Sequence, residues 1–578
     1  MSIYDYDRLL PPLPIPELAD TCENLKEMTK PLLDTKEWTD MCAAAESFQH
    51  KDGKALQRYL LQWKAEQEGN SSWLRPVWDD NYLSFRDRLP INMNYTFQLK
   101  KDRWGNSALP KLLHGLCHIL NGMRTETLPA EKLRETPLSM EALSHMIYTR
   151  IPDTVRDTLY YPPLSASYTA AVVCRGYWFL LSLTDVLGDI HSPEALQRGL
   201  DKIRQEAEQM PETADIGALT CAPRTEAADL RRLLQSSAVN RINLQSLENS
   251  VCVICLDETN SESFMRELII GSPANRWFDK SIQFICNDTE LGINFEHSGC
   301  DAGIWVYLLS LIDEYAVNQI TPEQTHNCTA DMRPLRFHIA VDIADQLKRI
   351  SRNYAELSRR ITVGEKKLET LSRSTIKKIN CRPDAVVQIL YQAAYYKLTG
   401  CFRSTYEAVS TRAFFQGRTE CVRPCTAEAA DFARSFVEKN ADNAAVLEKY
   451  RLAEQAHMVQ IKRCQSGLGA ERHMTGLMFM HVMNSAGAAA PPDIFETQGY
   501  KTLKHDILST SSTTAPFIDF FGFGPVVWEG LGIGYGIKSD ALHIAVSAYE
   551  GSGIKPQEFI NTLDELGREF CTLAMNSA

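Results

Sequence analysis

The stretch FEHSGCDAGIWVYLLSLI, residues 295–312, places a histidine and an aspartate directly before a long apolar run. His297 and Asp301 are four residues apart, so on one helical turn their side chains share a face. Histidine is the natural general base near neutral pH, and a carboxylate beside it can hold the imidazole or a neighbouring arginine. A purely structural histidine fits the same spacing, so the rest of the chain has to separate the two interpretations.

The segments around this stretch alternate between strand-like and helix-like patterns. Runs rich in β-branched and aromatic residues predict strands, and apolar residues at helical spacing predict helices. The mixture indicates an α/β architecture with two sheets. The predicted strands are 249–257, 281–288, 335–342, 522–537 and 541–553; the predicted helices are 37–49, 54–68, 109–123, 304–319, 343–361, 383–400 and 556–575.

The glycine-rich run GLGIGYGI, residues 530–537, alternates glycine with apolar residues and opens no helix. A dinucleotide-binding loop would lead into a helix. We therefore predict a strand whose glycines let another part of the backbone come close.

Composition narrows the function classes. With 578 residues the chain can hold more than one domain, and a net charge of −12 argues against a dedicated nucleic-acid binder. The 16 cysteines lie scattered in apolar segments, which favours a reducing compartment over a disulfide framework. The start of the chain lacks a signal-peptide pattern, and no apolar run is long enough to cross a bilayer. We expect a soluble, cytoplasmic protein.

Two motifs could suggest a metal site, and we interpret both as structural. His114 and His118 lack the glutamate of a HExxH motif and lie among apolar residues. Cys252 and Cys255 fall on a predicted strand, where residues three apart point to opposite faces. We expect no metal.

Motifs in a fixed order along nearly the whole chain resemble the carnitine/choline acyltransferase family, most closely its short-chain carnitine acetyltransferases. They are LPPLPIPELADTCENLKEMTKPLL at the start, NRWFDKSIQFI followed by NFEHSGCDAG, CRPDAVVQILYQAAYYKLTGCFRSTYEAVSTRAFFQGRTECVR, LSTSSTTA, and FGPVVWEGLGIGYGI.

The resemblance implies two domains of chloramphenicol-acetyltransferase-like topology, each a mixed β-sheet flanked by helices. One domain would cover 71–338, and the other would combine 1–70 with 339–578. An active-site tunnel would lie between them. The same resemblance implies a monomer that uses acyl-CoA and carnitine as substrates, with no bound cofactor.

By the same resemblance, His297 is the general base for direct acyl transfer, without an acyl-enzyme. Ser511 would donate a hydrogen bond to the oxyanion. Asp301 would orient the histidine or pair with Arg418.

Arg472 occupies the position at which carnitine enzymes have arginine and choline enzymes have asparagine. Carnitine carries a carboxylate, and a carboxylate favours a bidentate arginine. Tyr406, Thr419 and Ser509 match the other carboxylate-binding positions, and Phe523 matches the aromatic surface for the trimethylammonium group. Departures such as Cys421, in place of threonine, leave choline or another amino alcohol as an alternative. A non-catalytic protein that binds coenzyme A or carnitine is a further alternative.

Phe521 falls at the position where longer-chain family members open a channel for the acyl chain. A phenylalanine there favours an acetyl or other short acyl group, although Gly522 removes bulk next to it. The phosphates of coenzyme A need a local basic patch in an acidic protein. The residues that match family positions for coenzyme A are Arg373, Lys377, Lys378 and Asp384.

Overall fold

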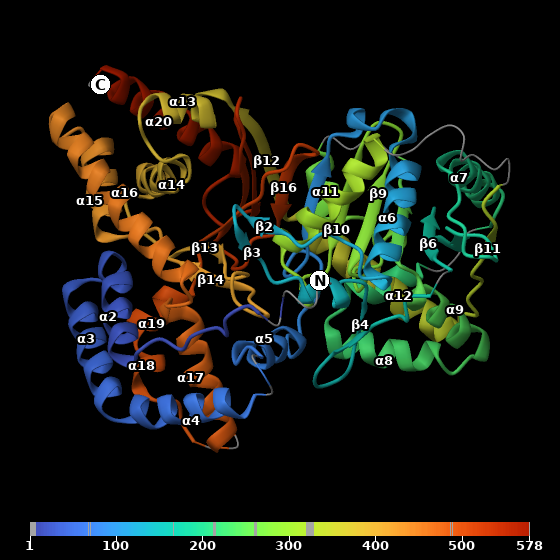
Figure 1. Cartoon of the computed structure of the whole chain (residues 1–578), viewed down its shortest axis with the longest axis horizontal. Coiled ribbons are helices and arrows are strands. Elements are labelled where there is room, and N and C mark those ends of the chain that lie inside the picture. Colours follow the sequence, from blue (N-terminus) through green and yellow to red (C-terminus); the bar gives the residue numbers. More distant parts are fainter. Residues whose placement is uncertain are drawn as a thin grey trace.

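The computed structural model describes residues 7, 9–67, 69, 71–165, 167–211, 215–258, 263–318, 329–485, 487 and 489–576. Two large sheets lie side by side, each flanked by helices, and the helices α2 to α4 lie beneath the left-hand sheet (Figure 1). This mixed α/β architecture with two helix-flanked sheets confirms the predicted fold class.

The first sheet has eight strands in the order β11-β7-β6-β8-β9-β10-β1-β16. Strands β6, β8 and β9 run parallel, and the other neighbouring pairs are antiparallel. The strands are β1 (Tyr95–Leu99), β6 (Thr169–Cys174), β7 (Tyr177–Ser182), β8 (Cys252–Leu256), β9 (Ile282–Cys286), β10 (Leu291–Phe295), β11 (Met332–Pro334) and β16 (Ile518–Phe523).

Both faces of this sheet are buried because alternate side chains enter different cores. On β6, Ala170 and Val172 join the core beneath α6 and α11, whereas Ala171 and Val173 join the core on the opposite face. Helices of these two faces are α6 (Ala108–Arg124), α7 (Pro193–Glu208), α8 (Arg224–Leu234), α9 (Ala238–Asn249), α10 (Phe264–Ile270), α11 (Ala302–Asn318) and α12 (Val341–Arg359).

The second sheet has six strands in the order β12-β18-β17-β15-β13-β14, with β13, β15 and β17 parallel to one another. Helix α14 begins at a proline and ends at Gly400 in the left-handed conformation, as its sequence predicts. The elements are β12 (Ile361–Leu368), β13 (Thr405–Ser410), β14 (Thr419–Val422), β15 (Leu508–Ser512), β17 (Leu531–Ile537), β18 (Leu542–Tyr549), α13 (Arg373–Lys378), α14 (Pro383–Thr399), α15 (Ala427–Glu438), α16 (Asn443–Gln465) and α20 (Pro556–Asn576).

The glycines of β17 confirm the predicted close approach. A Cβ added at Gly536 would lie 2.7 Å from the backbone oxygen of Thr513, and one at Gly532 would lie 2.9 Å from that of Phe523. At Gly534 an added Cβ would collide with the backbone of Phe521. Only glycine lets β17 lie this close to β16, the strand that pairs with β1 in the other sheet.

The strand predicted at 335–342 is wrong. After β11 the Leu335 amide still donates to the Trp178 carbonyl of β7 at 2.7 Å, but no strand is formed over 336–340, and α12 begins at Val341. Asparagine side chains of α9 satisfy this backbone instead: Asn243 donates to the Arg336 carbonyl at 2.7 Å, and Asn240 accepts from the amide of His338 at 2.7 Å. Side-chain capping of this kind is not visible in a local hydrophobic pattern.

The N-terminal helices form a separate core with helices from the last third of the chain. Leu25 of α2 and Met41 of α3 are buried with Met474 of α17. The helices of this region are α2 (Leu18–Thr29), α3 (Thr35–His50), α4 (Asp52–Glu66), α5 (Leu74–Leu83), α17 (Ala470–Ser485), α18 (Asp493–Glu496) and α19 (Gln498–Lys504). The domain boundaries and the tunnel stay predictions.

Among the helices that the structure describes, none combines the length and apolar character that crossing a membrane requires.

Candidate active site

His297 lies in the loop between β10 and α11, and 28% of its side chain is exposed. Its Nδ1 atom lies 3.1 Å from the carbonyl oxygen of Cys300. A carbonyl can only accept, so Nδ1 carries the proton and Nε2 keeps a free lone pair. This tautomer is the one that a general base needs.

The surroundings of His297 favour the neutral imidazole. Burial lowers the pKa of His297 below its ordinary value; the Asp301 carboxylate opposes this shift and the Arg418 guanidinium adds to it. The rings of Tyr95 and Tyr82 stand edge-on to the imidazole, with centroids 4.8 and 5.4 Å away. Burial therefore favours the neutral imidazole, and the two rings hold its orientation.

Asp301 lies 4.0 Å from Nδ1 of His297 and is bound in fork geometry by Arg418. Arg418 Nε donates to one carboxylate oxygen at 2.8 Å, and Nη2 donates to the other at 3.1 Å. The guanidinium also donates to the backbone carbonyls of His297 and Ser298. Arg418 therefore ties Asp301 to the loop that carries the histidine.

A buried polar network supports the same loop from below. Glu296 accepts from Tyr148 OH at 2.7 Å, from Ser298 Oγ at 2.6 Å and from Arg150 Nη1 at 3.2 Å. Arg150 also donates to Asp157 at 2.7 Å. Because these groups are fully buried and hydrogen-bonded, the loop has little freedom to rearrange.

Arg472, Tyr406 and Thr419 come together from three different elements, α17, β13 and β14. Arg472 Nη2 donates to Tyr406 OH at 2.9 Å, and Nε donates to the carbonyl oxygen of Thr419 at 3.0 Å. Within the described ranges, Arg472 forms no ion pair, whereas Arg418 pairs with Asp301 and Arg423 with Glu471. Arg472 is thus a positioned guanidinium that has no carboxylate in ion-pair contact among the described residues.

Trp78 of α5 lies between the two halves of this site. Its ring centroid is 4.5 Å from the Arg472 guanidinium carbon and 5.1 Å from that of Arg418. Stacking on a tryptophan face fixes the plane of a guanidinium and leaves its edge for a planar anion.

Glu420 lies beside Arg472 and accepts from the amides of Cys421 at 2.8 Å and Arg472 at 3.2 Å. Burial raises the pKa of Glu420 to about 7, although the charge of Arg472 opposes the shift. This carboxyl is therefore partly protonated near neutral pH and only partly offsets the arginine.

Ser509 and Ser511 lie on β15. The register pairs Ser509 with Tyr406 on β13, and Ser511 with Gly534 on β17. In the part of the chain that the structure describes, neither hydroxyl has a hydrogen-bond partner, so both can bind a ligand.

Aromatic rings fill the space beside Tyr95 and His297. Phe521 is 4% exposed, and its ring centroid lies 5.6 Å from Phe97 and 6.2 Å from Tyr95. Phe523 packs on Phe521 at 5.6 Å. Gly522 faces the opposite side, where an added Cβ would lie 2.6 Å from Met265 Sδ, so this glycine opens no space beside His297.

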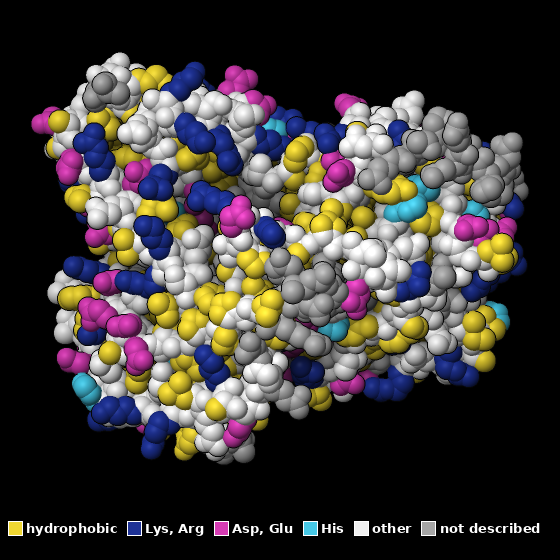
Figure 2. All heavy atoms as spheres, viewed as in Figure 1, with side chains coloured by type: hydrophobic (Ala, Val, Ile, Leu, Met, Phe, Trp, Pro, Cys, Tyr) yellow, Lys and Arg dark blue, Asp and Glu magenta, His cyan; other side chains and the backbone are white. Residues whose placement is uncertain are grey.

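The predicted basic residues for coenzyme A lie on α13. Lys377 and Lys378 are exposed, and neither forms an ion pair among the described residues. Arg373 donates through Nη2 to the carbonyl of Ile537 at 3.1 Å, which anchors α13 to the end of β17. Figure 2 shows Lys and Arg side chains over the upper left of this face, where Figure 1 places α13.

Asp384 lies apart from these lysines in a cluster with Glu407 and His457. Their nitrogen and oxygen atoms lie within 4.8 Å of one another, a set that could hold a cation. Tyr535 OH donates to Asp384 at 2.8 Å, and His457 lies at 3.3 Å. Burial and the charge of Asp384 hold the pKa of Glu407 well above its usual range, so Glu407 carries a proton.

Sequence reasoning missed Trp78, Tyr82 and Tyr95. Each approaches the site from a distant segment, and aromatic residues at helical or strand spacing indicate only a core. The roles predicted for the site residues named above stay predictions, although the structure brings several of them into contact.

The structure thus combines two helix-flanked sheets with a histidine site. In that site an arginine binds the aspartate beside the histidine in fork geometry. The family profile described as Choline/Carnitine o-acyltransferase matches residues 13–565. The chain belongs to this family.

Curated relatives agree with that assignment. Human mitochondrial carnitine O-palmitoyltransferase 2 is 26% identical, covering 97% of this chain and 91% of the relative. A putative mitochondrial carnitine O-acetyltransferase of Saccharomyces cerevisiae is 26% identical, covering 93% and 90%. The structure of TRI3 trichothecene 15-O-acetyltransferase from Fusarium sporotrichioides is 10% identical, with coverage of 86% and 93% and a TM-score of 0.39.

Proposed function

We propose that the protein transfers a short acyl group, acetyl above all, reversibly between coenzyme A and carnitine. The observation that carries the proposal is Arg472, held by Tyr406 and Thr419 and stacked on Trp78, with no ion pair among the described residues. A half-buried guanidinium without a counter-ion is unfavourable until a ligand carboxylate arrives. Carnitine supplies that carboxylate.

His297 would start the reaction. Nε2 accepts the proton of the carnitine hydroxyl while its oxygen attacks the thioester carbonyl carbon. The Ser511 hydroxyl donates to the resulting oxyanion, an interaction typically worth about 3 kcal/mol. Collapse breaks the carbon–sulfur bond, and the imidazolium returns its proton to the coenzyme A sulfur. The negative charge of Asp301 stabilises the imidazolium while Arg418 keeps Asp301 in place.

Lys377 and Lys378 would bind coenzyme A phosphates, and Ser509 would add a hydrogen bond to the carnitine carboxylate. Phe523 would offer its ring to the trimethylammonium group. The packed rings around Phe521 support a short acyl group, because they occupy the volume beside His297. A cytoplasmic location and a monomeric state belong to this proposal as well.

Choline is the alternative acceptor, and Arg472 argues against it because choline leaves the guanidinium unpaired. A non-catalytic role in binding coenzyme A or carnitine is the other alternative. The free lone pair on His297 Nε2 favours catalysis over that role.

The test compares thiol release from acetyl-CoA with L-carnitine and with choline at equal concentration. We expect release with carnitine, and a fall in kcat/KM of about 100-fold in Arg472→Asn, as for loss of a charged hydrogen-bonded pair. The matched control Arg451→Asn, an exposed arginine of α16, should change kcat/KM less than twofold. Release with choline alone would contradict the carnitine assignment, and release with neither would contradict the enzymatic one.

A further inference from the structure

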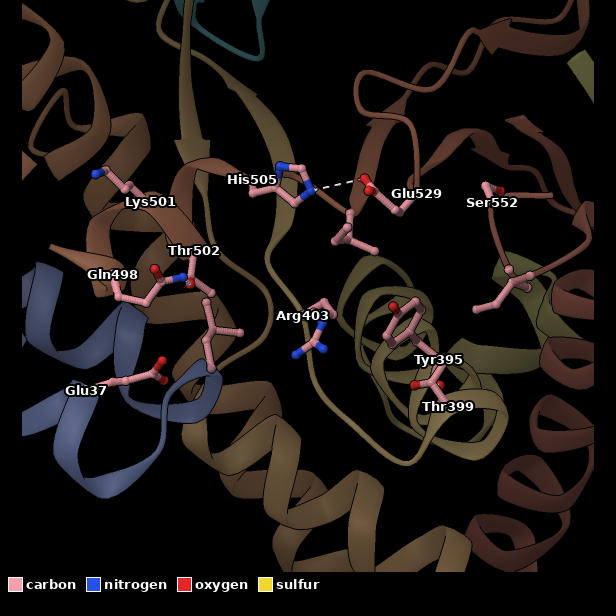
Figure 3. A pocket seen from close by; sticks show the side chains of 14 residues that line it. Glu37, Tyr395, Thr399, Arg403, Gln498, Lys501, Thr502, His505, Glu529 and Ser552 are labelled. Atoms are coloured by element: carbon pink, nitrogen blue, oxygen red, sulfur yellow. Dashed lines mark hydrogen bonds and ion pairs between the residues drawn. The ribbon is translucent and has the colours of Figure 1, made fainter. Parts of the chain in front are cut away.

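A cavity of about 700 Å³ lies away from His297, at the amino ends of the parallel strands of the second sheet. Its lining includes Arg403, two residues before β13, Ile507, directly before β15, and Glu529, two residues before β17. The first turn of α3 and the last turn of α14 close its sides with Glu37 and Tyr395 (Figure 3). Ligand pockets in proteins commonly measure roughly 300–1,000 Å³.

Two opposite charges in this cavity have no counter-ion among the residues that the structure describes. The exposed Arg403 side chain donates to the carbonyl of its neighbour Phe402 at 3.3 Å. The Glu37 carboxylate accepts from the amide of Asp34 at 3.2 Å, as part of the N-terminal capping box of α3. Across the described ranges, neither side chain forms an ion pair, with each other or with any other residue.

The lysine of the cavity is paired, and its second carboxylate lies beside a histidine. Lys501 lies 2.8 Å from Glu496, and His505 lies 3.3 Å from Glu529, the pair marked by the dashed line in Figure 3. In the same view the Arg403 guanidinium and the Glu37 carboxylate both project toward the open centre of the cavity (Figure 3).

Between the two charges the lining is partly apolar. Leu32, Ile507 and Ile554 contribute to the walls, and the Tyr395 ring stands near Arg403. Burial raises the pKa of Tyr395 to about 12, so its hydroxyl keeps its proton and can donate to an anion.

We propose that this cavity binds a small zwitterion, with its carboxylate on Arg403, its ammonium group on Glu37 and its aliphatic part on the apolar walls. A ligand with one charge would leave the other side chain unpaired, whereas a zwitterion neutralises both. The inference does not depend on the proposed acyl transfer.

A charged network centred on the buried side chains of Glu471 and Arg423 separates this cavity from the Arg472 cluster. Lys504, adjacent to His505 in the cavity wall, donates to Glu471 at 2.7 Å. Arg423 donates to the same carboxylate at 2.8 Å and also pairs with Asp506. Because this network already neutralises its own charges, it joins neither site, and the cavity is a second site.

The test uses calorimetric titration of the full chain with 6-aminohexanoate, hexanoate and hexylammonium at low ionic strength. All titrations are repeated on Arg472→Asn, which removes binding of a carboxylate at the proposed active site. We expect 6-aminohexanoate to bind both proteins, and the two singly charged probes to bind at least about tenfold more weakly.

Arg403→Gln and Glu37→Gln should each weaken 6-aminohexanoate by about tenfold or more. Glutamine at position 37 preserves the capping box, so α3 remains intact. The control variants Arg451→Gln and Glu448→Gln, an exposed pair on α16, should change the Kd less than twofold.

Equal binding of hexanoate would overturn the zwitterion assignment, as would binding that neither Arg403→Gln nor Glu37→Gln weakens. Absence of 6-aminohexanoate binding to Arg472→Asn would overturn the second site itself. Acetyl transfer to carnitine is measured separately, so failure of the proposed activity and failure of this site give different results.

Discussion

Each of the three arginines near the site has a different electrostatic setting. Arg418 binds Asp301 in a fork, Arg423 is enclosed by Glu471 and Asp506, and Arg472 stacks on Trp78 without an ion pair among the described residues. The sequence identifies all three as arginines but not which has a counter-ion, because their partners lie tens to hundreds of residues away. The family resemblance, rather than local pattern, singled out position 472.

Glu420 should make binding of a carboxylate acceptor depend on pH. Its folded pKa of about 7 lies above the ordinary carboxyl value, so it is neutral below pH 7 and ionised above it. Ionised Glu420 offsets the charge of Arg472, so KM for carnitine should rise severalfold between pH 6 and pH 8.5. The measurement is the pH profile of KM in the wild type and in Glu420→Gln, where the rise should disappear.

A rise of equal size in Glu420→Gln would assign the effect to another group. KM for acetyl-CoA serves as an internal control, and it should not follow the same profile.

Phe521 should limit the length of the acyl chain. Phe521→Ala removes a ring from the volume beside Tyr95, so the ratio of kcat/KM for octanoyl-CoA to that for acetyl-CoA should increase at least about tenfold. The cavity should cost about 3–5 kcal/mol of folding stability. The control Phe520→Ala, whose side chain enters the opposite core, should lose stability without this change in ratio.

At the scale of elements, the loop between β10 and α11 depends on buried partners from distant segments. Tyr148, Arg150 and Glu296 hold it in place. Sequence patterns predict the strand β9, which pairs with β10, and the helix α11, because each carries a long periodic or apolar run. The loop geometry was not predictable, since charge pairs in a core leave no periodic signal.

Glu296 should act as a positioning residue. Glu296→Gln replaces one carboxylate oxygen with an amide NH2 group, which cannot accept the hydrogen bonds that Tyr148, Ser298 and Arg150 donate. The loop should therefore shift, and kcat should fall about 10- to 100-fold. KM values should change less than about threefold. Glu248→Gln is the matched control: it breaks another buried pair, with Arg231 at 2.6 Å, and should lower stability while leaving kcat unchanged.

The measurement is steady-state kinetics together with thermal unfolding of both variants. Equal losses of kcat in the two variants would show that general destabilisation, and not loop position, accounts for the effect.

At the scale of the whole molecule, β16 joins the two sheets. It pairs with β1 in the eight-stranded sheet while β17 of the six-stranded sheet packs against its backbone (Figure 1). The alternating glycines of residues 530–537 allowed this close approach to be predicted, but not which strand approaches. The strand predicted at 335–342 failed because asparagine side chains replace a neighbouring strand.

Gly534→Ala should disrupt this junction. The new methyl group would collide with the backbone of Phe521, which cannot move without disturbing the pairing of β16 with β1. We expect a loss of roughly 1–3 kcal/mol or more, and calorimetry should resolve two unfolding transitions where the wild type shows one. Ile533→Val on the same strand, which removes one buried methyl group, should keep a single transition.

The shared strand also constrains how such a protein can change over evolution. Residues 518–523 come late in the chain yet complete a sheet built mostly from residues 95–334. A recombination event between these segments would separate β16 from the strand it was selected to match. New specificities should therefore arise by point substitution within one lineage, and chimaeras that exchange the two halves between relatives should fold poorly unless 518–523 travels with its partner strand.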